Sequence, residues 1–311
     1  MRNITRILVA DDLARDERTA PSAALKLASD LAASLSAEIH LVHSYHIPEL
    51  TLPVQSMVAL EAPYVEEMRK ALNGESDNIR SSRPALRIVP EVEKGDTVEV
   101  LLKEISDHGC DLAVLHTHAR KGVRRALLGS VTEQFIRRSP VPVLTVNPHT
   151  RLENAYRPTK ILVALDLTTP QSSVVAEAAA DFGRLANSQL ILSHVIEEWA
   201  YPVVQSASLL AGGAYLPLER DLREEAIARD QEIKKLAQQL ALGLPSDVVQ
   251  TRIIEKATSI GEAIVDLAVK EDCNLIVMSH HRMGRLEAAL LGSVNRQVIR
   301  DAHCPVLTLP E

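Results

Sequence analysis

The chain is built from two copies of one sequence pattern. Arg6–Asp12 (Arg-Ile-Leu-Val-Ala-Asp-Asp) returns as Lys160–Asp166 (Lys-Ile-Leu-Val-Ala-Leu-Asp). Four further pairs follow in the same order: Ala37–Ser44 with Ser188–Val195, Cys110–Leu115 with Cys273–Met278, Ala126–Val131 with Ala289–Val294, and Val141–Val146 with Cys304–Leu309. Five collinear matches indicate two homologous domains. We predict domains at residues 1–148 and 158–311, joined by a polar segment bounded by Pro148 and Pro158.

Each copy alternates short aliphatic runs with longer amphipathic stretches. The strands expected in the first copy are Leu8–Ala10, Ile39–His43, Leu86–Val89, Leu112–Leu115 and Val143–Val146. The helices expected are Ala20–Ser36, Asp96–His108 and Ser130–Arg138, with Leu218–Leu242 in the second copy. This alternation predicts an α/β fold: two tandem, doubly wound, Rossmann-like domains, each a five-stranded parallel open sheet with helices on both faces. Such sheets bind ligands at the carboxyl ends of the strands, where the strand order reverses.

Composition argues against several classes of protein. The net charge is −7 and only 3% of residues are aromatic, whereas a nucleic-acid binder needs a basic face or stacking rings. No run of about 18 apolar residues exists, and Asp11 and Asp12 interrupt the first apolar segment, which argues against membrane spanning and secretion. Three scattered cysteines are too few for a disulfide framework. We therefore expect a cytoplasmic protein without a nucleic-acid or membrane partner.

Two kinds of residue at the expected strand ends suggest a ligand site. Asp12 and Asp166 end the first strand of each copy, where a carboxylate accepts hydrogen bonds from ribose hydroxyls, ligates a metal ion or caps a helix. Gly129-Ser130 and Gly292-Ser293 precede helices, where backbone N–H groups approach an anion closely. The alternative for both serines is helix capping, since Ser130–Glu133 has the capping-box pattern and Ser293 fits a simple N-cap.

The duplicated segments together resemble a tandem universal stress protein. The resemblance rests on three segments of each copy: the Ile-Leu-Val-Ala-x-Asp start, the Leu-x-His-x segment, and the Leu-Leu-Gly-Ser-Val element with the Pro-Val-Leu-Thr strand that follows it. The nucleotide-binding branch of that family has the motif Gly-x2-Gly-x9-Gly-Ser/Thr and holds ATP. The resemblance places the nucleoside contacts on Asp12, Ser44, Asp166 and Val195, and the phosphate contacts on Gly129, Ser130, Gly292 and Ser293.

The first two glycines of that motif are missing here. Counted back from Gly129 and Gly292, their positions hold His116, Ala119, Ser279 and Arg282. An alignment with one deletion, which matches Gly122 to Gly284, does not restore the opening pair. A side chain there takes space next to a phosphate oxygen. The cations Arg120 and Arg282 are expected to offset part of this loss through charge-assisted hydrogen bonds.

Histidines also gather at the strand ends of the first copy. His43, His46, His116 and His118 suggest a Zn²⁺ site if the second and fourth strands flank the first. The alternative is that these histidines are solvated or hydrogen-bonded structural residues. Two stretches without charged residues, Leu50–Leu60 and Ala200–Leu218, are interpreted as loops that cover the crevice or meet a second subunit.

The sequence thus predicts a stress-response protein that binds an adenine nucleotide, ATP, in at least one of two crevices. We expect a sensor or regulator, at most a weak ATPase, since no nucleophile–base pair or P-loop lysine motif is present. The alternative is an interaction or carrier protein whose degenerate pockets hold a metal ion or an apolar ligand. The resemblance also implies that the last strands of the two copies pair within the chain as a pseudo-dimer, which covers both sheet edges. A further homodimer is expected to form through the uncharged loops.

Overall fold

The computed structural model describes residues 4–13, 21–46, 54–117, 128–152, 155–197, 218–241, 248–280 and 291–310. The first half comprises β1 (Arg6–Ala10), α1 (Ala23–Leu35), β2 (Glu38–Tyr45), α2 (Val54–Ser82), β3 (Ile88–Lys94), α3 (Thr97–His108), β4 (Leu112–His116), α4 (Ser130–Arg138) and β5 (Val143–Val146). The second half comprises β6 (Lys160–Ala164), α5 (Gln171–Ala186), β7 (Gln189–Glu197), α7 (Leu218–Ala241), β8 (Val249–Ala257), α8 (Ile260–Lys270), β9 (Leu275–Ser279), α9 (Ser293–Asp301) and β10 (Val306–Leu309).

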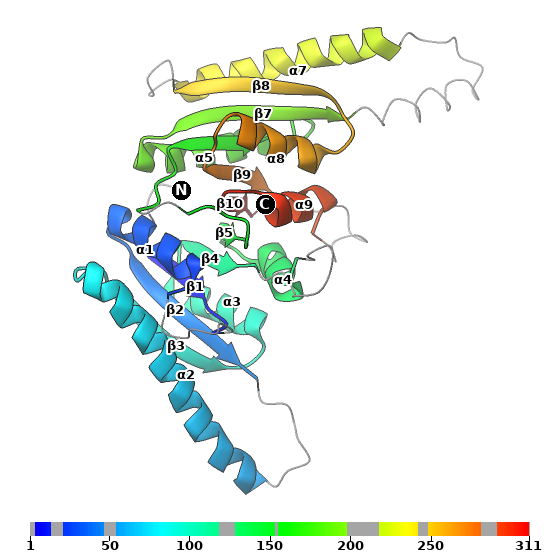
Figure 1. The fold of residues 1–311 in the computed structure, drawn as a ribbon. Coiled ribbons are helices and arrows are strands. Elements are labelled where there is room, and N and C mark those ends of the chain that lie inside the picture. Colours follow the sequence, from blue (N-terminus) through cyan, green and yellow to red (C-terminus); the bar gives the residue numbers. More distant parts are fainter. Residues whose placement is uncertain are drawn as a thin grey trace.

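All the described strands form one ten-stranded sheet, in the order β3-β2-β1-β4-β5-β10-β9-β6-β7-β8 (Figure 1). Neighbouring strands are parallel except at the centre, where β5 and β10 run antiparallel with Leu144 opposite Leu307. The expected doubly wound α/β fold is confirmed, and so is the pairing of the two last strands. Each half therefore contributes five strands, and their junction protects both inner sheet edges.

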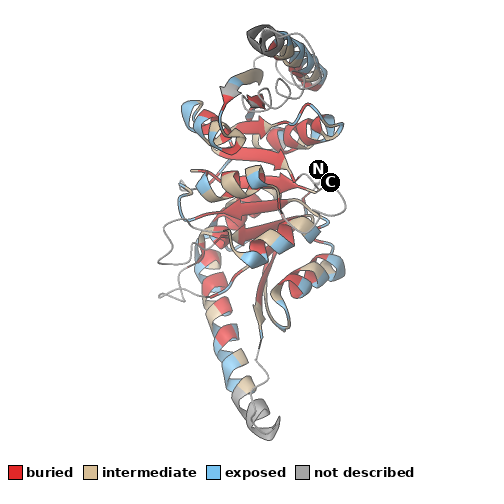
Figure 2. Ribbon diagram, turned by 90° about the vertical axis from the view of Figure 1, so that its right-hand side faces the viewer, coloured by how far each residue is buried: buried red, intermediate tan, exposed pale blue. Residues whose placement is uncertain are grey.

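The sheet is buried on both faces, as its aliphatic sequence predicts (Figure 2). Side chains alternate along β1, so Ile7 joins the apolar cluster under α1 and α2 while Leu8 joins the one under α3 and α4. Both clusters include residues of both halves, for example Leu307 with Ile7 and Val306 with Leu8. The packed core thus runs through the junction between the halves.

Two predicted boundaries are wrong. The third strand is Ile88–Lys94 instead of Leu86–Val89, because an edge strand alternates apolar and polar residues and so hides its length. Residues 54–60 of the expected uncharged loop form the start of α2, whose later turns bury Met68, Leu72 and Ile79. Absence of charge was therefore a poor sign of a loop. Residues 50–53 and 200–217 of the two uncharged stretches lie outside the described part of the chain.

Helix boundaries follow local chemistry elsewhere. Ser22 caps α1 by accepting a hydrogen bond from Leu25 N, and Asp96 caps α3 by accepting from Val98 N and Glu99 N. Gly109, with φ = 61°, ends α3 in the left-handed conformation that glycine adopts easily. Among the described helices, none has the length and apolarity needed to cross a membrane.

Candidate functional site

The strand order reverses at β1 in the first half and at β6 in the second. β1 lies between β2 and β4, and β6 lies between β7 and β9, so both expected flanking strands are in place. Connections leave on opposite sides of each first strand, which opens a crevice at its carboxyl end. The residues predicted to bind a ligand belong to the segments around these two crevices.

A buried histidine fixes the point at which each first strand leaves the sheet. His43 Nδ1 lies 2.8 Å from the Asp11 carbonyl oxygen, and His194 Nδ1 lies 3.0 Å from the Leu165 carbonyl oxygen. Both imidazoles are buried, and the ring nitrogen at a backbone carbonyl acts as the donor. The histidine of the Leu-x-His-x segment therefore holds the backbone turn that shapes the crevice.

Ser44 and Val195 present backbone groups beyond the end of the first strand. The Val42 carbonyl faces β1, where it accepts from Asp11 N, and the Tyr45 carbonyl faces β3, where it accepts from Gly95 N. Backbone groups alternate sides along a strand, so those of Ser44 face the side of β1. β1 ends at Ala10, opposite Val42, which leaves Ser44 past its last paired residue.

The second half repeats this arrangement. Leu165 N donates to Ser193 O at 2.8 Å, and β6 ends at Ala164, opposite Ser193. Val195 therefore takes the place of Ser44 at the second crevice. The side chains differ in their surroundings, since Ser44 Oγ donates to Thr97 Oγ1 at 2.8 Å whereas Val195 is buried.

Asp12 and Asp166 are exposed at the crevice mouths, and neither is a helix N-cap. The N-cap of α1 is Ser22, and that of α5 is Pro170. Asp166 instead stabilises the turn before α5: its Oδ1 accepts from Thr168 N at 3.0 Å and from Thr168 Oγ1 at 2.5 Å. The capping alternative for these two carboxylates is wrong.

The Gly-Ser pairs begin α4 and α9, but with the glycine as the N-cap residue in each case. The first bonds of the helical ladder run from Glu133 N to Gly129 O and from Arg296 N to Gly292 O, both 3.0 Å. Ser130 and Ser293 are therefore the first helical residues, and the capping-box and N-cap interpretations of them are wrong. Because glycine has no side chain, neither N-cap residue covers the N–H groups of its own first turn.

Glu133 joins the two Gly-Ser segments across the centre of the molecule. Its Oε1 accepts a hydrogen bond from Leu291 N at 3.1 Å and lies 4.0 Å from a guanidinium nitrogen of Arg296. Arg296 occupies the position in α9 that Glu133 occupies in α4. Sequence analysis placed Glu133 in a cap of its own helix and missed this contact, which requires the pairing of β5 with β10.

The structure leaves part of the predicted site unplaced. His116 and Ser279 end β4 and β9 and are half-buried, whereas Ala119, Arg282 and His118 lie outside the described residues. His46 follows β2 and is exposed. Within the described residues, His43, His46 and His116 do not form a three-ligand group, so a metal site there depends on His118 and stays a prediction.

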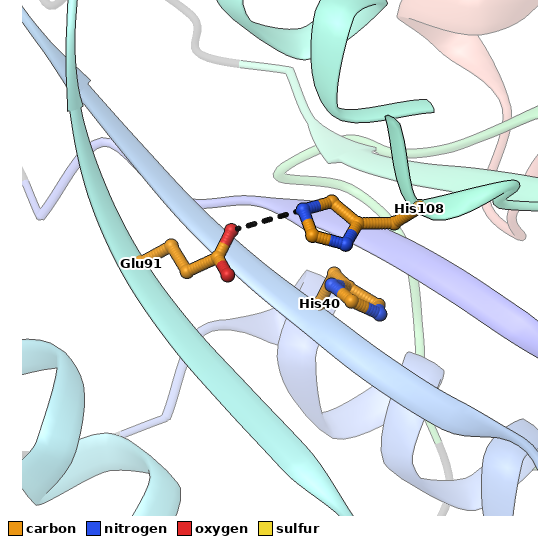
Figure 3. A group of neighbouring side chains, drawn as sticks. All are labelled: His40, Glu91 and His108. Carbon is orange, nitrogen blue, oxygen red and sulfur yellow. Dashed lines mark ion pairs between the residues drawn. The ribbon is translucent and has the colours of Figure 1, made fainter. Parts of the chain in front are cut away.

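A different group of ligands gathers elsewhere in the first half. One ligand atom from each of His40, Glu91 and His108 lies within 4.8 Å of the other two. Figure 3 shows these three side chains next to one another. The three residues come from β2, β3 and the end of α3. Sequence analysis missed them, because their spacing of 51 and 17 residues (91 − 40 and 108 − 91) follows no metal-binding pattern.

Comparison with known proteins places the whole chain in one family. The model of the Universal stress protein family matches residues 3–147 and 158–310. Two universal stress proteins of Methanocaldococcus jannaschii are 29% and 30% identical over 157 and 159 residues, covering 50% and 48% of this chain and 84% and 93% of their own lengths.

A solved universal stress protein from Archaeoglobus fulgidus has the same fold over both halves. It superposes with a TM-score of 0.64 at 17% identity, covering 99% of this chain and 97% of its own. A second structure, described as a putative universal stress protein from Pseudomonas aeruginosa, gives 0.61 at 17% identity, with 99% and 94% covered. Because the family model matches each half in turn, the protein belongs to the universal stress protein family and carries two of its domains in tandem.

Proposed function

We propose that the chain binds an adenine nucleotide, ATP, in at least one of its two crevices and acts as a cytoplasmic regulator of the stress response. The observation that carries the proposal is the pair of glycine-capped helix starts, Gly129-Ser130 and Gly292-Ser293, at the crevices. The first-turn amides of α4 and α9 point their partial positive charge away from the helix, where an anion is stabilised.

The glycines themselves support this assignment. Gly129 has φ = −61° and Gly292 has φ = −53°, values that any residue adopts. A Cβ added at Gly129 would meet Thr132 Oγ1 at 3.9 Å, and one at Gly292 would meet Asn295 Nδ2 at 4.0 Å, which are ordinary contacts. Neither backbone strain nor packing within the described residues therefore demands glycine, whereas close approach of a phosphate does.

The nucleoside end of the ligand fits the other side of each crevice. Asp12 and Asp166 place an exposed carboxylate at the carboxyl end of the first strand, suited to accept hydrogen bonds from ribose hydroxyls. The backbone of Ser44 and of Val195, past the end of that strand, is suited to recognise the adenine edge. Recognition by backbone explains how serine and valine serve at equivalent positions.

We propose regulation rather than dedicated catalysis. The mechanism derived from these residues is orientation and charge stabilisation: carboxylates hold the ribose, and helix starts hold the phosphates. Asp166 Oδ1 is already engaged by the backbone and hydroxyl of Thr168, which hold it in the turn before α5. Any ATPase activity is expected to be weak, and the bound nucleotide is expected to act as the signal.

Titration calorimetry of the full chain with ATP tests the proposal. Gly129→Ala and Gly292→Ala each add a Cβ beside the proposed phosphate position without a clash in the free protein, so at least one is expected to weaken ATP binding by about tenfold or more. Gly74→Ala in α2, where a Cβ meets nothing within 4 Å, is the matched control and is expected to bind as the wild type does. No ATP binding by the wild type, or unchanged binding by the double variant, would overturn the proposal.

A further inference from the structure

The group formed by His40, Glu91 and His108, here called the β3-edge cluster, lies far from the crevices in the fold. His40 is near the start of β2, and His108 is the last residue of α3, which runs back toward the amino ends of the strands. Arg6 at the start of β1 donates to the His108 carbonyl at 3.0 Å, which places the cluster at the amino end of the sheet. The nucleotide crevices lie at the opposite, carboxyl end.

Contacts within the cluster are short. His108 Nε2 lies 3.7 Å from Glu91 Oε2, and the ring centroids of His40 and His108 are 4.4 Å apart (Figure 3). A second carboxylate adjoins them, since Glu104 Oε2 lies 3.2 Å from His108 Nε2. Register supports the arrangement: Glu91 pairs with Val42, two residues beyond His40, and therefore lies on the same face of the sheet.

Burial leaves part of this group without a partner. His40 is 5% exposed, and its Nδ1 has no hydrogen-bond partner among the described residues. Glu104 is 3% exposed, and its Oε2 approaches His108 without hydrogen-bond alignment. Buried polar atoms are normally paired, so these orphaned atoms indicate a missing ligand. His108, at 36% side-chain exposure, leaves a route for that ligand from solvent.

The gathering of two carboxylates, Glu91 and Glu104, beside two imidazoles suits a cation. Burial, and then the neighbouring Glu91, raises the pKa of Glu104 to about 7. Burial and the nearby His108 lower the pKa of His40, which favours the neutral imidazole that metals bind. A divalent ion would stabilise both carboxylates in their charged form.

The second half provides an internal comparison, because it fills the same place without ligands. Ile191 stands where His40 does, and Leu267 precedes Cys273 by six residues, as Glu104 precedes Cys110. Ser193 pairs with Arg252 as Val42 pairs with Glu91.

At the positions of Glu91 and His108, the second half has Arg252 and Glu271, which form an ion pair with each other. Arg252 Nε donates to Glu271 Oε1 at 2.7 Å, and Glu271 stands at the position of His108. The fold is thus satisfied by two apolar residues and one ion pair at this place. The two imidazoles and two carboxylates of the first half are not required by the fold.

We propose that His40, His108 and Glu91 bind one divalent transition-metal ion of the Zn²⁺ type, with Glu104 as the adjacent fourth ligand. Two neutral imidazoles and two carboxylates give a neutral complex with such an ion, and nitrogen with oxygen ligands suits Zn²⁺. The ion would tie the edge strand β3 and β2 to the end of α3, stabilising the outer rim of the first half. This site does not depend on the proposed nucleotide binding.

Calorimetric titration of the chelator-treated full chain with ZnCl₂ tests the site. We expect one saturable equivalent, at least about tenfold weaker binding in His108→Ala and in Glu91→Gln, and a rise in melting temperature on addition of Zn²⁺ to the wild type. His149→Ala removes an exposed histidine outside the cluster and is the matched control, expected to bind as the wild type does. Absence of saturable binding, or equal affinity in the wild type and His108→Ala, would overturn the proposal.

A measurement on the wild type alone guards against misfolded variants. X-ray absorption of the one-equivalent zinc form should show two imidazole nitrogens with oxygen atoms completing the shell. A shell with a sulfur ligand, or without imidazole, would contradict the site. Loss of the single equivalent in His43→Ala or His46→Ala, with His108→Ala unaffected, would place the ion at the crevice and contradict it as well.

Discussion

The Glu133 carboxylate accepts a hydrogen bond from the backbone N–H of Leu291 at 3.1 Å, linking helix α4 of the first half to the Gly-Ser segment of the second. Leu291 directly precedes Gly292, the N-cap residue of α9. The contact makes the position of the second helix start dependent on the first half. The Glu133 side chain therefore connects the two Gly-Ser segments across the central β5–β10 junction.

Glu133→Ala should loosen the second helix start. A buried backbone N–H loses its acceptor and Arg296 loses its counter-charge, so we expect the free energy of unfolding to fall by about 1 to 2 kcal/mol. Urea denaturation checks this value. Glu99→Ala is the matched control: it removes an exposed pair with Arg138, which water and salt screen, and should leave the free energy of unfolding almost unchanged. Equal effects of the two variants would show that the contact across the junction contributes nothing.

His194→Ala should damage the second crevice and leave the first intact. The variant removes the donor to the Leu165 carbonyl, so the turn after β6 loses the hydrogen bond that fixes it. We expect destabilisation of about 1 to 3 kcal/mol, measured by urea denaturation, and weaker nucleotide binding in the second half.

His43→Ala is the companion variant, with the same expectation for the first crevice through Asp11. Calorimetric titration with ATP on both variants then shows which half binds. If neither variant changes stability, the two histidines do not hold the strand ends.

Stability should depend on the protonation of Glu104. Its pKa in the folded protein is about 7, above its ordinary value of 4.5, so the folded state holds a proton that the unfolded state has released. The stabilising contribution of this group is present below about pH 4.5 and is lost as the pH rises toward 7. His40 acts in the opposite sense, since its lowered pKa makes the folded state less stable as the pH falls.

Glu104→Gln isolates the contribution of the carboxyl group. We expect the difference in unfolding free energy, variant minus wild type, to increase by about 1 to 3 kcal/mol as the pH rises from about 5 to about 8. Urea denaturation in the presence of chelator measures this difference at each pH. A difference that stays constant over this range would show that Glu104 titrates normally.

Zinc affinity should fall on acidification. Binding to the β3-edge cluster displaces the proton held by Glu104 and requires neutral His40 and His108, so lowering the pH from about 7.5 to about 6 should weaken Zn²⁺ binding by about tenfold or more. The charged groups around the cluster are Glu38, Glu93, Arg6 and Lys103. Calorimetry in buffers of different ionisation enthalpy should show proton release at pH 7. Zinc binding without proton release would mean that the ion does not displace the proton of Glu104.

The fold was predictable because the signals that define it are local and duplicated. Buried parallel strands such as Leu112–His116 are continuous aliphatic runs, and the pairing of the two last strands was implied by the resemblance to the universal stress protein family. The bounds of the edge strand β3 were wrong and the helix α2 was missed, because Ile88–Lys94 mixes polar with apolar residues and Val54–Leu60 has no charges to show a helical pattern.

The site was only partly predictable, for physical reasons. Segments after strand ends could be found from the Gly-Ser pairs, but the role of His43 could not, because a hydrogen bond to Asp11 O depends on where β1 leaves the sheet. The β3-edge cluster depends on the register of β2 with β3 and on the length of α3. Neither quantity can be read from residue spacing.

The central claim is that two glycine-capped helix starts hold the anionic end of an adenine nucleotide. Calorimetric titration of the wild-type chain with ATP and, in parallel, with adenosine tests it most directly. If the first-turn amides of α4 and α9 bind the phosphates, ATP should bind at least about tenfold more tightly than adenosine, with a difference that shrinks as salt is added. Equal affinities for the two ligands, or no binding of ATP, would contradict the claim.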